Sequence, residues 1–257
     1  MKLIDAHIHI CENLYGFGSR GELRCIGGGL VQYADGSSFQ MFPPELGETG
    51  ISPEAVMGAM DRAGIEKAVI LQGNFIGPQN LYTWDALQKY PERFTGAACY
   101  DPFCRKSEEV RKHLFEDLGF KIVKFEVSDG SGLMSYHREF PLDGEMMEEA
   151  MEYAEAHGIT AVFDIGRRGG CCWQPYALAE LIKRHKNMQF VVCHLLAPQG
   201  RSYENEWGDA MRALNQENVV FDLASLPHNQ KPEPYPYPTA VWFIKEAIQI
   251  LGQDRMM

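Results

Sequence analysis

Residues 3–10, with the sequence LIDAHIHI, are the stretch from which the fold of this chain is best argued. Their apolar character and alternation predict a buried strand. Side chains of a strand point alternately to its two faces, so Asp5, His7 and His9 share one face and the isoleucines share the other. Two imidazoles on an apolar strand are costly to bury without partners, and a divalent metal ion is the commonest partner that takes both. The stretch therefore predicts that His7 and His9 bind a metal ion.

Length and charge limit the class of protein. The 257 residues, 45% of them hydrophobic, can bury a full core, and α/β barrels of about this size usually form one domain, so we expect a single domain over 1–257. The net charge of −11, from 24 basic and 35 acidic residues, repels phosphate backbones and gives no attraction to anionic membranes. We expect a small-molecule substrate and neither a nucleic-acid nor a membrane partner; a homo-oligomer stays open.

Targeting and cysteine patterns point to the same class. No apolar run approaches the roughly 18 residues of a membrane span, and the N-terminus reads as a strand rather than a secretory leader. We therefore expect a cytoplasmic protein. The seven cysteines are odd in number and lack C-x-x-C spacing, which indicates neither a disulfide framework nor a zinc knuckle.

From position 52 onward, helical and strand patterns alternate. Ser52 as N-cap, Pro53 at the first helical position and Gly64 as a stop predict one helix, and residues 67–72 form an apolar run typical of a parallel strand buried on both faces. Alternation with short spacers favours a parallel sheet, and seven such strands favour a closed (β/α)8 TIM barrel. Further strands are expected near 94–100, 120–127, 159–165, 189–194 and 218–223, and further helices near 79–90, 107–118, 144–157, 175–186, 204–216 and 239–251.

Residues 11–50 are rich in glycine and aromatic residues and show no clear period. Loops longer than about 15 residues are uncommon in compact domains and are usually binding loops or lids. We therefore expect a long loop over 11–50 that covers the histidine pair. Arg20 in this loop either meets an anionic substrate or is a solvated surface charge.

Polar residues mark the ends of the later strands, where the chemistry of such barrels lies. The strand near 120–127 carries Lys124 and Glu126, and the strand near 189–194 ends in His194. Histidines that converge from separated segments are what a metal or acid-base site requires, which makes His194 a candidate for that site. Lys124 either forms an ion pair with a nearby carboxylate or touches substrate or metal.

Asp164 ends the apolar strand near 159–165, where a carboxylate is out of place. A buried carboxylate needs a cation beside it. A metal ion, Arg167 or Arg168 could supply that cation.

Three segments carry a family resemblance. IDAHIH at 4–9, GFKIVK at 119–124 and VCH at 192–194 resemble the amidohydrolase superfamily, and more narrowly its branch that includes aminocarboxymuconate-semialdehyde decarboxylase. The resemblance covers essentially the whole chain. It implies a distorted (β/α)8 barrel that holds one divalent metal ion, often zinc, through His7 and His9. It also implies that His194 handles protons near the metal-bound water.

The chain departs from the family pattern at two points. Where many members have a metal-binding histidine at the end of strand five, this chain has Asp164, which either ligates zinc or pairs with Arg167. Members typically continue from a stretch like DRMM at 254–257 into strand eight, with a metal-binding aspartate. The resemblance therefore implies a 257-residue chain whose strand eight is truncated, and we expect such a chain to bind metal weakly, turn over poorly and aggregate.

The leading interpretation is a metal-dependent hydrolase of a small, anionic or carbonyl-containing molecule, acting through a metal-activated water. His194 and Asp164 are its candidate catalytic residues, and Lys124, Arg167 and Arg20 its candidate substrate-binding residues. A non-oxidative decarboxylase of an aromatic or muconate-like acid would use the same site. A non-catalytic binding protein is the third interpretation, motivated by Asp164 and the truncated strand eight.

Overall fold

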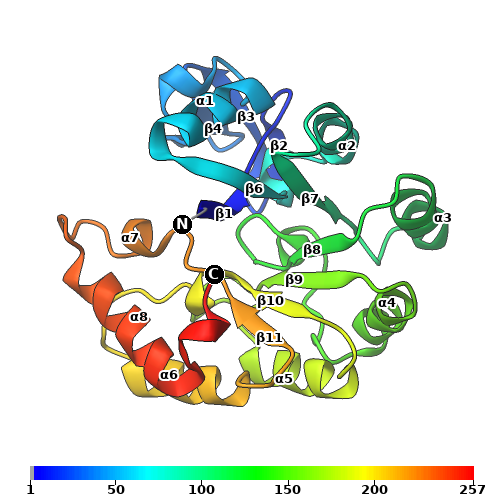
Figure 1. The fold of residues 1–257 in the computed structure, drawn as a ribbon, viewed down its shortest axis with the longest axis vertical. Helices are drawn as coiled ribbons and strands as arrows, with labels where there is room; N and C mark the ends of the chain where they lie inside the picture. The colour runs from blue at the N-terminus through cyan, green and yellow to red at the C-terminus, as the bar shows by residue number, and fades with distance from the viewer. Residues whose placement is uncertain (1–2) are drawn as a thin grey trace. The chain divides into compact units, whose positions relative to one another are not determined.

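The computed structural model describes residues 3–257, and the chain divides into two compact units, Met1–His137 and Arg138–Met257. Seven parallel strands alternate with helices along the described residues (Figure 1). The predicted α/β fold, a distorted (β/α)8 barrel without an eighth strand in the described part, is confirmed. The single domain expected over 1–257 stays a prediction.

The first unit contains four of these parallel strands: β1 (Leu3–Ile8), β6 (Ile65–Leu71), β7 (Phe94–Cys99) and β8 (Ile122–Glu126). β1 pairs with β6, β6 with β7, and β7 with β8. β8 has four buried residues out of five, as expected of a parallel strand covered on both faces. Within residues 3–257, β1 pairs only with β6, so its other edge carries no ladder.

Helices of the first unit begin and end where the sequence predicts. The Ser52 side chain accepts a hydrogen bond from the Ala55 amide at 3.1 Å and caps α1 (Pro53–Ala63). Gly64 ends α1 in the left-handed region, with φ of 70°. The remaining helical segments are η2 (Asn74–Ile76), α2 (Asn80–Lys89), α3 (Ser107–Lys112), which continues as the π-helical η3 (His113–Asp117), and η4 (Leu133–Ser135).

The loop predicted over 11–50 is wrong, because most of this segment is an antiparallel sheet. Its strands are β2 (Tyr15–Gly18), β3 (Gly21–Gly27), β4 (Leu30–Tyr33) and β5 (Ser38–Gln40), followed by η1 (Pro44–Leu46). Leu23, Cys25 and Val31 point inward while their neighbours are exposed or only partly buried, so the alternation of a half-buried sheet is present. Strands of three to seven residues are too short to stand out among the glycines. Gly28 and Gly29, with φ of 52° and 74°, form the tight β3–β4 turn.

The antiparallel sheet is closely joined to η2. A Cβ built on Gly16 of β2 would lie 1.9 Å from the Phe75 carbonyl oxygen, so only glycine allows this backbone approach. Below the sheet, Leu23 and Val31 pack with Leu14, Phe42 and other apolar residues in one buried cluster. The antiparallel sheet is therefore packed closely against other parts of the first unit.

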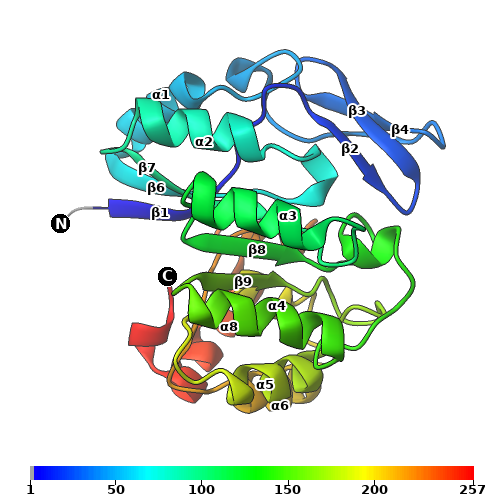
Figure 2. The same ribbon diagram turned by 90° about the vertical axis from the view of Figure 1, so that its right-hand side faces the viewer.

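The second unit holds the parallel strands β9 (Thr160–Asp164), β10 (Phe190–Val192) and β11 (Val219–Phe221), with β10 in the middle. Among its helices, α6 contacts both α5 and α8 (Figure 2). These helices match the predicted ranges within a few residues, and no helix among residues 3–257 has the length and apolar character needed to cross a bilayer. The helical segments are α4 (Glu145–Ala156), α5 (Pro175–Arg184), η5 (Cys193–Leu196), α6 (Glu204–Ala213), α7 (Leu226–Asn229), α8 (Pro238–Leu251) and η6 (Gln253–Arg255).

Candidate functional site

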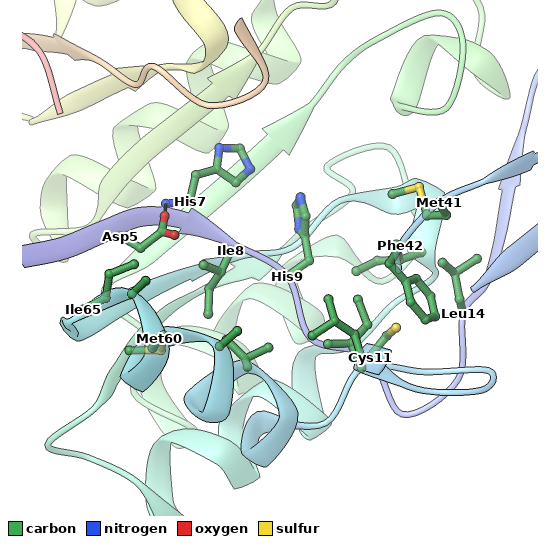
Figure 3. Close-up of a pocket in the computed structure, with 16 residues that line it drawn as sticks. Asp5, His7, Ile8, His9, Cys11, Leu14, Met41, Phe42, Met60 and Ile65 are labelled. Carbon is green, nitrogen blue, oxygen red and sulfur yellow. Dashed lines mark hydrogen bonds between the residues drawn. The ribbon is translucent and has the colours of Figure 1, made fainter. Parts of the chain in front are cut away.

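His7 and His9 stand at the carboxyl end of β1 and project to the same side of the strand, whereas Ile8 points to the other side, toward α1 (Figure 3). Their ring centroids are 5.0 Å apart and the rings meet edge-on, at 72°. The Asp5 carboxylate accepts a hydrogen bond from the His7 backbone amide at 3.1 Å. The two imidazoles predicted to act together are thus adjacent and half-buried.

Lys124 on β8 reaches the histidine pair across 117 residues of sequence. Its Nζ lies 3.1 Å from His7 Nε2, and the lysine is only 2% exposed. An ammonium group can only donate, so with Lys124 charged the His7 ring accepts at Nε2 and is neutral. A neutral imidazole is also the form that ligates metals, through the lone pair that accepts from Lys124 here.

Glu126, two residues further along β8, is 7% exposed and lies beside Gly73. A Cβ built on Gly73 would meet Glu126 Oε2 at 2.3 Å and the Phe75 ring at 2.8 Å. The Phe75 ring packs edge-on against His9, with centroids 5.5 Å apart. Glycine at position 73 therefore leaves room for a buried carboxylate and for the aromatic ring that supports His9.

Gln72 fixes the chain just after the histidines. Its side-chain amide, fully buried, donates to the Ile10 carbonyl and to Thr83 Oγ1, both at 2.8 Å. Sequence reasoning missed Gln72 and Gly73. The sequence signal that could have identified them is a polar residue followed by a glycine, directly after the apolar run 68–71.

A cavity of about 410 Å3 adjoins the histidine pair (Figure 3). This volume lies in the range of small-molecule sites. Apart from Asp5, His7 and His9, its walls are apolar and come from α1 and from the segments around the antiparallel sheet. The apolar wall includes Leu14, Met41, Phe42, Leu46, Ile51, Val56, Met60, Ile65 and Ile76.

In the second unit, Asp164 and His194 come together. Asp164 ends β9, and its Oδ2 lies 3.4 Å from His194 Nε2. The other ring nitrogen, Nδ1, lies 3.0 Å from the Ala224 carbonyl oxygen and 3.4 Å from Asp222 Oδ1. Sequence reasoning missed Asp222, although it follows the apolar strand 219–221 directly, in the same way that Asp164 ends an apolar strand.

The electrostatics of His194 follow from these two carboxylates. The side chains of His194, Asp164 and Asp222 are 15%, 17% and 1% exposed. Burial by itself lowers the pKa of His194, but hydrogen bonding and charge interaction with Asp164 and then Asp222 outweigh it and raise the pKa to about 10. His194 is therefore an imidazolium at neutral pH, able to donate a proton.

The arginines expected near substrate have other positions. Arg20 lies in the β2–β3 turn, where it donates to Ser37 Oγ at 3.2 Å, and it does not line the cavity beside the histidines. Arg168 pairs with Glu206 at 2.6 Å, and Arg167 is exposed. His194 is thus a cationic partner of Asp164, a role that the sequence left to a metal ion or an arginine.

Solved structures similar to this chain share its fold. An amidohydrolase from Burkholderia multivorans with bound zinc has a TM-score of 0.71 at 13% identity, covering 100% of this chain and 83% of that one. A probable 2-pyrone-4,6-dicarboxylic acid hydrolase from Acinetobacter baumannii, with citric acid bound, has a TM-score of 0.65 at 14% identity, covering 100% and 82%. A 2,6-dihydroxybenzoate decarboxylase from Rhizobium has a TM-score of 0.52 at 14% identity, covering 80% and 76%.

Sequence identities of 13–14% to these solved structures show the fold alone, so the family is assigned from a family model. A search of curated proteins finds no match. The family model described as Amidohydrolase matches residues 4–257, which include His7, His9 and all seven parallel strands apart from Leu3. That match covers nearly the whole chain, and this protein therefore belongs to the amidohydrolase family of enzymes.

Proposed function

We propose that this chain is a metal-dependent hydrolase of a small carbonyl-containing or anionic molecule, with His7 and His9 as ligands of one divalent metal ion. The observation that carries the proposal is the pair of imidazoles, with ring centroids 5.0 Å apart, that project to the same side of β1 with Lys124 beside them. Histidine nitrogens are common zinc ligands, and a similar structure has zinc bound, so zinc is the proposed ion.

The residues around the pair fit such an ion. Lys124 Nζ lies 3.1 Å from His7 Nε2, so with Lys124 charged this nitrogen carries the lone pair that a metal ion would take in place of the ammonium. The buried carboxylate of Glu126 adds negative charge to the same unit. When bound, a divalent metal would supply Lewis acidity, which lowers the pKa of a water molecule and polarises a carbonyl group.

The chemistry of the walls suggests the substrate class. The apolar lining suits a small molecule with a hydrophobic part. Lys124, which does not line this cavity, stays a candidate for binding a carboxylate or carbonyl oxygen beside His7. Similarity to the probable 2-pyrone-4,6-dicarboxylic acid hydrolase supports an anionic substrate. Arg20 and Arg167, which are exposed, stay candidates for guiding such an anion. A cytoplasmic location without nucleic-acid partners is part of this proposal.

We assign His194 and Asp164 to proton transfer. With its pKa raised to about 10, His194 holds a proton at neutral pH and can deliver it to a leaving group, while Asp164 stabilises the imidazolium. The same property supports a second candidate, a non-oxidative decarboxylase, in which the imidazolium protonates the carbon that loses CO2. Similarity to a decarboxylase structure is consistent with this alternative.

The metal assignment is tested on purified protein by elemental analysis and by titration with zinc. His7→Ala/His9→Ala should lose at least most of the bound metal, because both imidazole ligands are removed. The matched control is His113→Ala/His157→Ala, which removes two exposed histidines. Equal metal content in the two double variants would contradict the assignment.

The reaction is tested with two substrate panels. Lactones and amides that carry carboxylates are followed by acid release, and aromatic carboxylic acids are followed by CO2 release. Turnover in the first panel that is lost in His194→Gln supports the hydrolase, and turnover confined to the second supports the decarboxylase. Metal binding without turnover of either panel would refute both.

A further inference from the structure

We propose that Asp222 is a positioning residue, which holds both the backbone turn and the ring of His194 so that Nε2 is the nitrogen that exchanges its proton. Asp222 has no role in the function proposed above. The inference rests on that function only for the catalytic importance of His194. Three structural features support it: the left-handed turn that begins at His194, the hydrogen bonds of the Asp222 carboxylate, and the acceptor that faces Nδ1 of the His194 ring.

Directly after β10, the backbone adopts a conformation that L-residues avoid. Residues 194–197 have φ values of 59°, 47°, 62° and 47°, and none of them is glycine. An L-residue in this region brings its Cβ too close to the following carbonyl oxygen, so the conformation is unfavourable at each of the four positions. Such a run persists only where the surrounding structure holds it, and it is typical of functional sites.

Asp222 makes several of the hydrogen bonds that keep this turn in place. Its Oδ1 accepts hydrogen bonds from the His194 amide at 2.9 Å and from the Ala224 amide at 3.0 Å. Its backbone oxygen accepts from the Leu195 amide at 3.2 Å. Because the Asp222 side chain is 1% exposed, these bonds form away from water, where a bond to a charged acceptor is strong.

A second contact holds the turn from the other side. The indole Nε1 of Trp207, a residue that is 1% exposed, donates to the Leu195 carbonyl oxygen at 2.8 Å. The turn is therefore held between the end of β11 and α6. Asp222 is the member of this arrangement that also lies beside the imidazole.

The ring of His194 is oriented by the same residues. Nδ1 lies 3.0 Å from the Ala224 carbonyl oxygen, which can only accept, so Nδ1 carries a hydrogen in both charge states of the ring. The proton that the ring gains and loses on titration is then the one on Nε2, which lies 3.4 Å from Asp164 Oδ2. Since Asp222 binds the Ala224 amide, it fixes the residue that supplies the acceptor for Nδ1.

Two variants separate the parts of this role. Asparagine at position 222 keeps an oxygen that accepts both amides but has no charge, whereas alanine removes the acceptor. In Asp222→Ala we expect the amides of His194 and Ala224 to exchange with solvent about ten- to a hundredfold faster, because each loses a charged acceptor. In Asp222→Asn we expect both amides to stay protected.

The ring is followed by 15N NMR of labelled histidine between pH 5 and 11, with chelator present. In the wild type Nε2 should titrate while Nδ1 stays protonated, and in Asp222→Ala both nitrogens should share the hydrogen. A wild-type ring that titrates at Nδ1 would overturn the proposal even if Asp222→Ala does not fold. Unchanged ring and amide signals in a folded Asp222→Ala would also overturn it.

These measurements need neither metal nor substrate, so they stand if the proposed hydrolase activity fails. If that activity is found, Asp222→Ala should lower kcat while KM stays within about twofold, because Asp222 does not touch the substrate. Asp222→Asn should recover at least part of kcat. A fall confined to KM would assign Asp222 to substrate binding and overturn the positioning role.

Discussion

Replacing Asp164 by asparagine should weaken the fold in a strongly pH-dependent manner. The change keeps the shape of the side chain and removes the charge that lies 3.4 Å from His194 Nε2. Hydrogen bonding to Asp164 is the first of the effects that raise the pKa of His194 to about 10 from its ordinary 6.5, against the lowering by burial. With a neutral amide at position 164, that pKa should fall toward the ordinary value.

The size of the effect follows from proton linkage. A histidine with pKa values of about 10 when folded and 6.5 when unfolded stabilises the folded state by about 4 kcal/mol at pH 7, by less than half of that at pH 9 and by almost nothing at pH 10. Asp222 shares in this shift, so we assign about 2–3 kcal/mol at pH 7 to Asp164. That loss corresponds to a fall in Tm of about 4–12 °C for a chain of this length.

The sign of the pH dependence is fixed by the direction of the shift. Because the folded-state pKa is raised, the stabilisation is fully present below pH 6.5 and is lost as the pH rises through 10. The wild type and Asp164→Asn should therefore differ most in neutral solution and converge near pH 10.

The assay is urea and thermal unfolding, followed by circular dichroism at pH 7, 9 and 10 on chelator-treated protein. Asp209→Asn is the control, because it removes an exposed carboxylate that pairs with Arg212 on the surface of the same unit. That pair should contribute less than about 1 kcal/mol, with little change over this pH range. An Asp164→Asn loss that is as large at pH 10 as at pH 7 would refute the argument.

Two further changes test local features of the first unit. Ser52→Ala removes the side chain that accepts from the Ala55 amide at 3.1 Å, and it should lower the free energy of unfolding by about 1 kcal/mol in urea titrations without altering zinc affinity. Gly73→Ala forces a Cβ to within 2.3 Å of Glu126 Oε2 and 2.8 Å of the Phe75 ring, and it should cost about 1–3 kcal/mol of stability. It should also weaken zinc binding measured by calorimetry, so unchanged stability and affinity would show that the site tolerates the methyl group.

Local sequence patterns were enough to predict most strands and helices of the parallel fold. The sequence was enough to place the two ends of α1, at Ser52 and Gly64, because capping depends on residues within one turn. Apolar runs such as 67–72 indicate buried strands, because burial on both faces leaves no polar positions. His7 and His9 could be placed on one face because strand geometry repeats every two residues. The antiparallel sheet within 11–50 was missed, because in strands as short as three residues two or three inward positions do not establish a period.

The contacts that shape the site depend on strand register and backbone path, which no short window of sequence contains. Lys124 meets His7 only because the parallel sheet of the first unit brings two strands 117 residues apart into range. Asp222 meets His194 because β10 and β11 pair in register and because four residues after β10 turn through left-handed conformations. Local propensity argues against that turn, since none of its residues is glycine, and the bonds from Asp222 and Trp207 help to offset its cost.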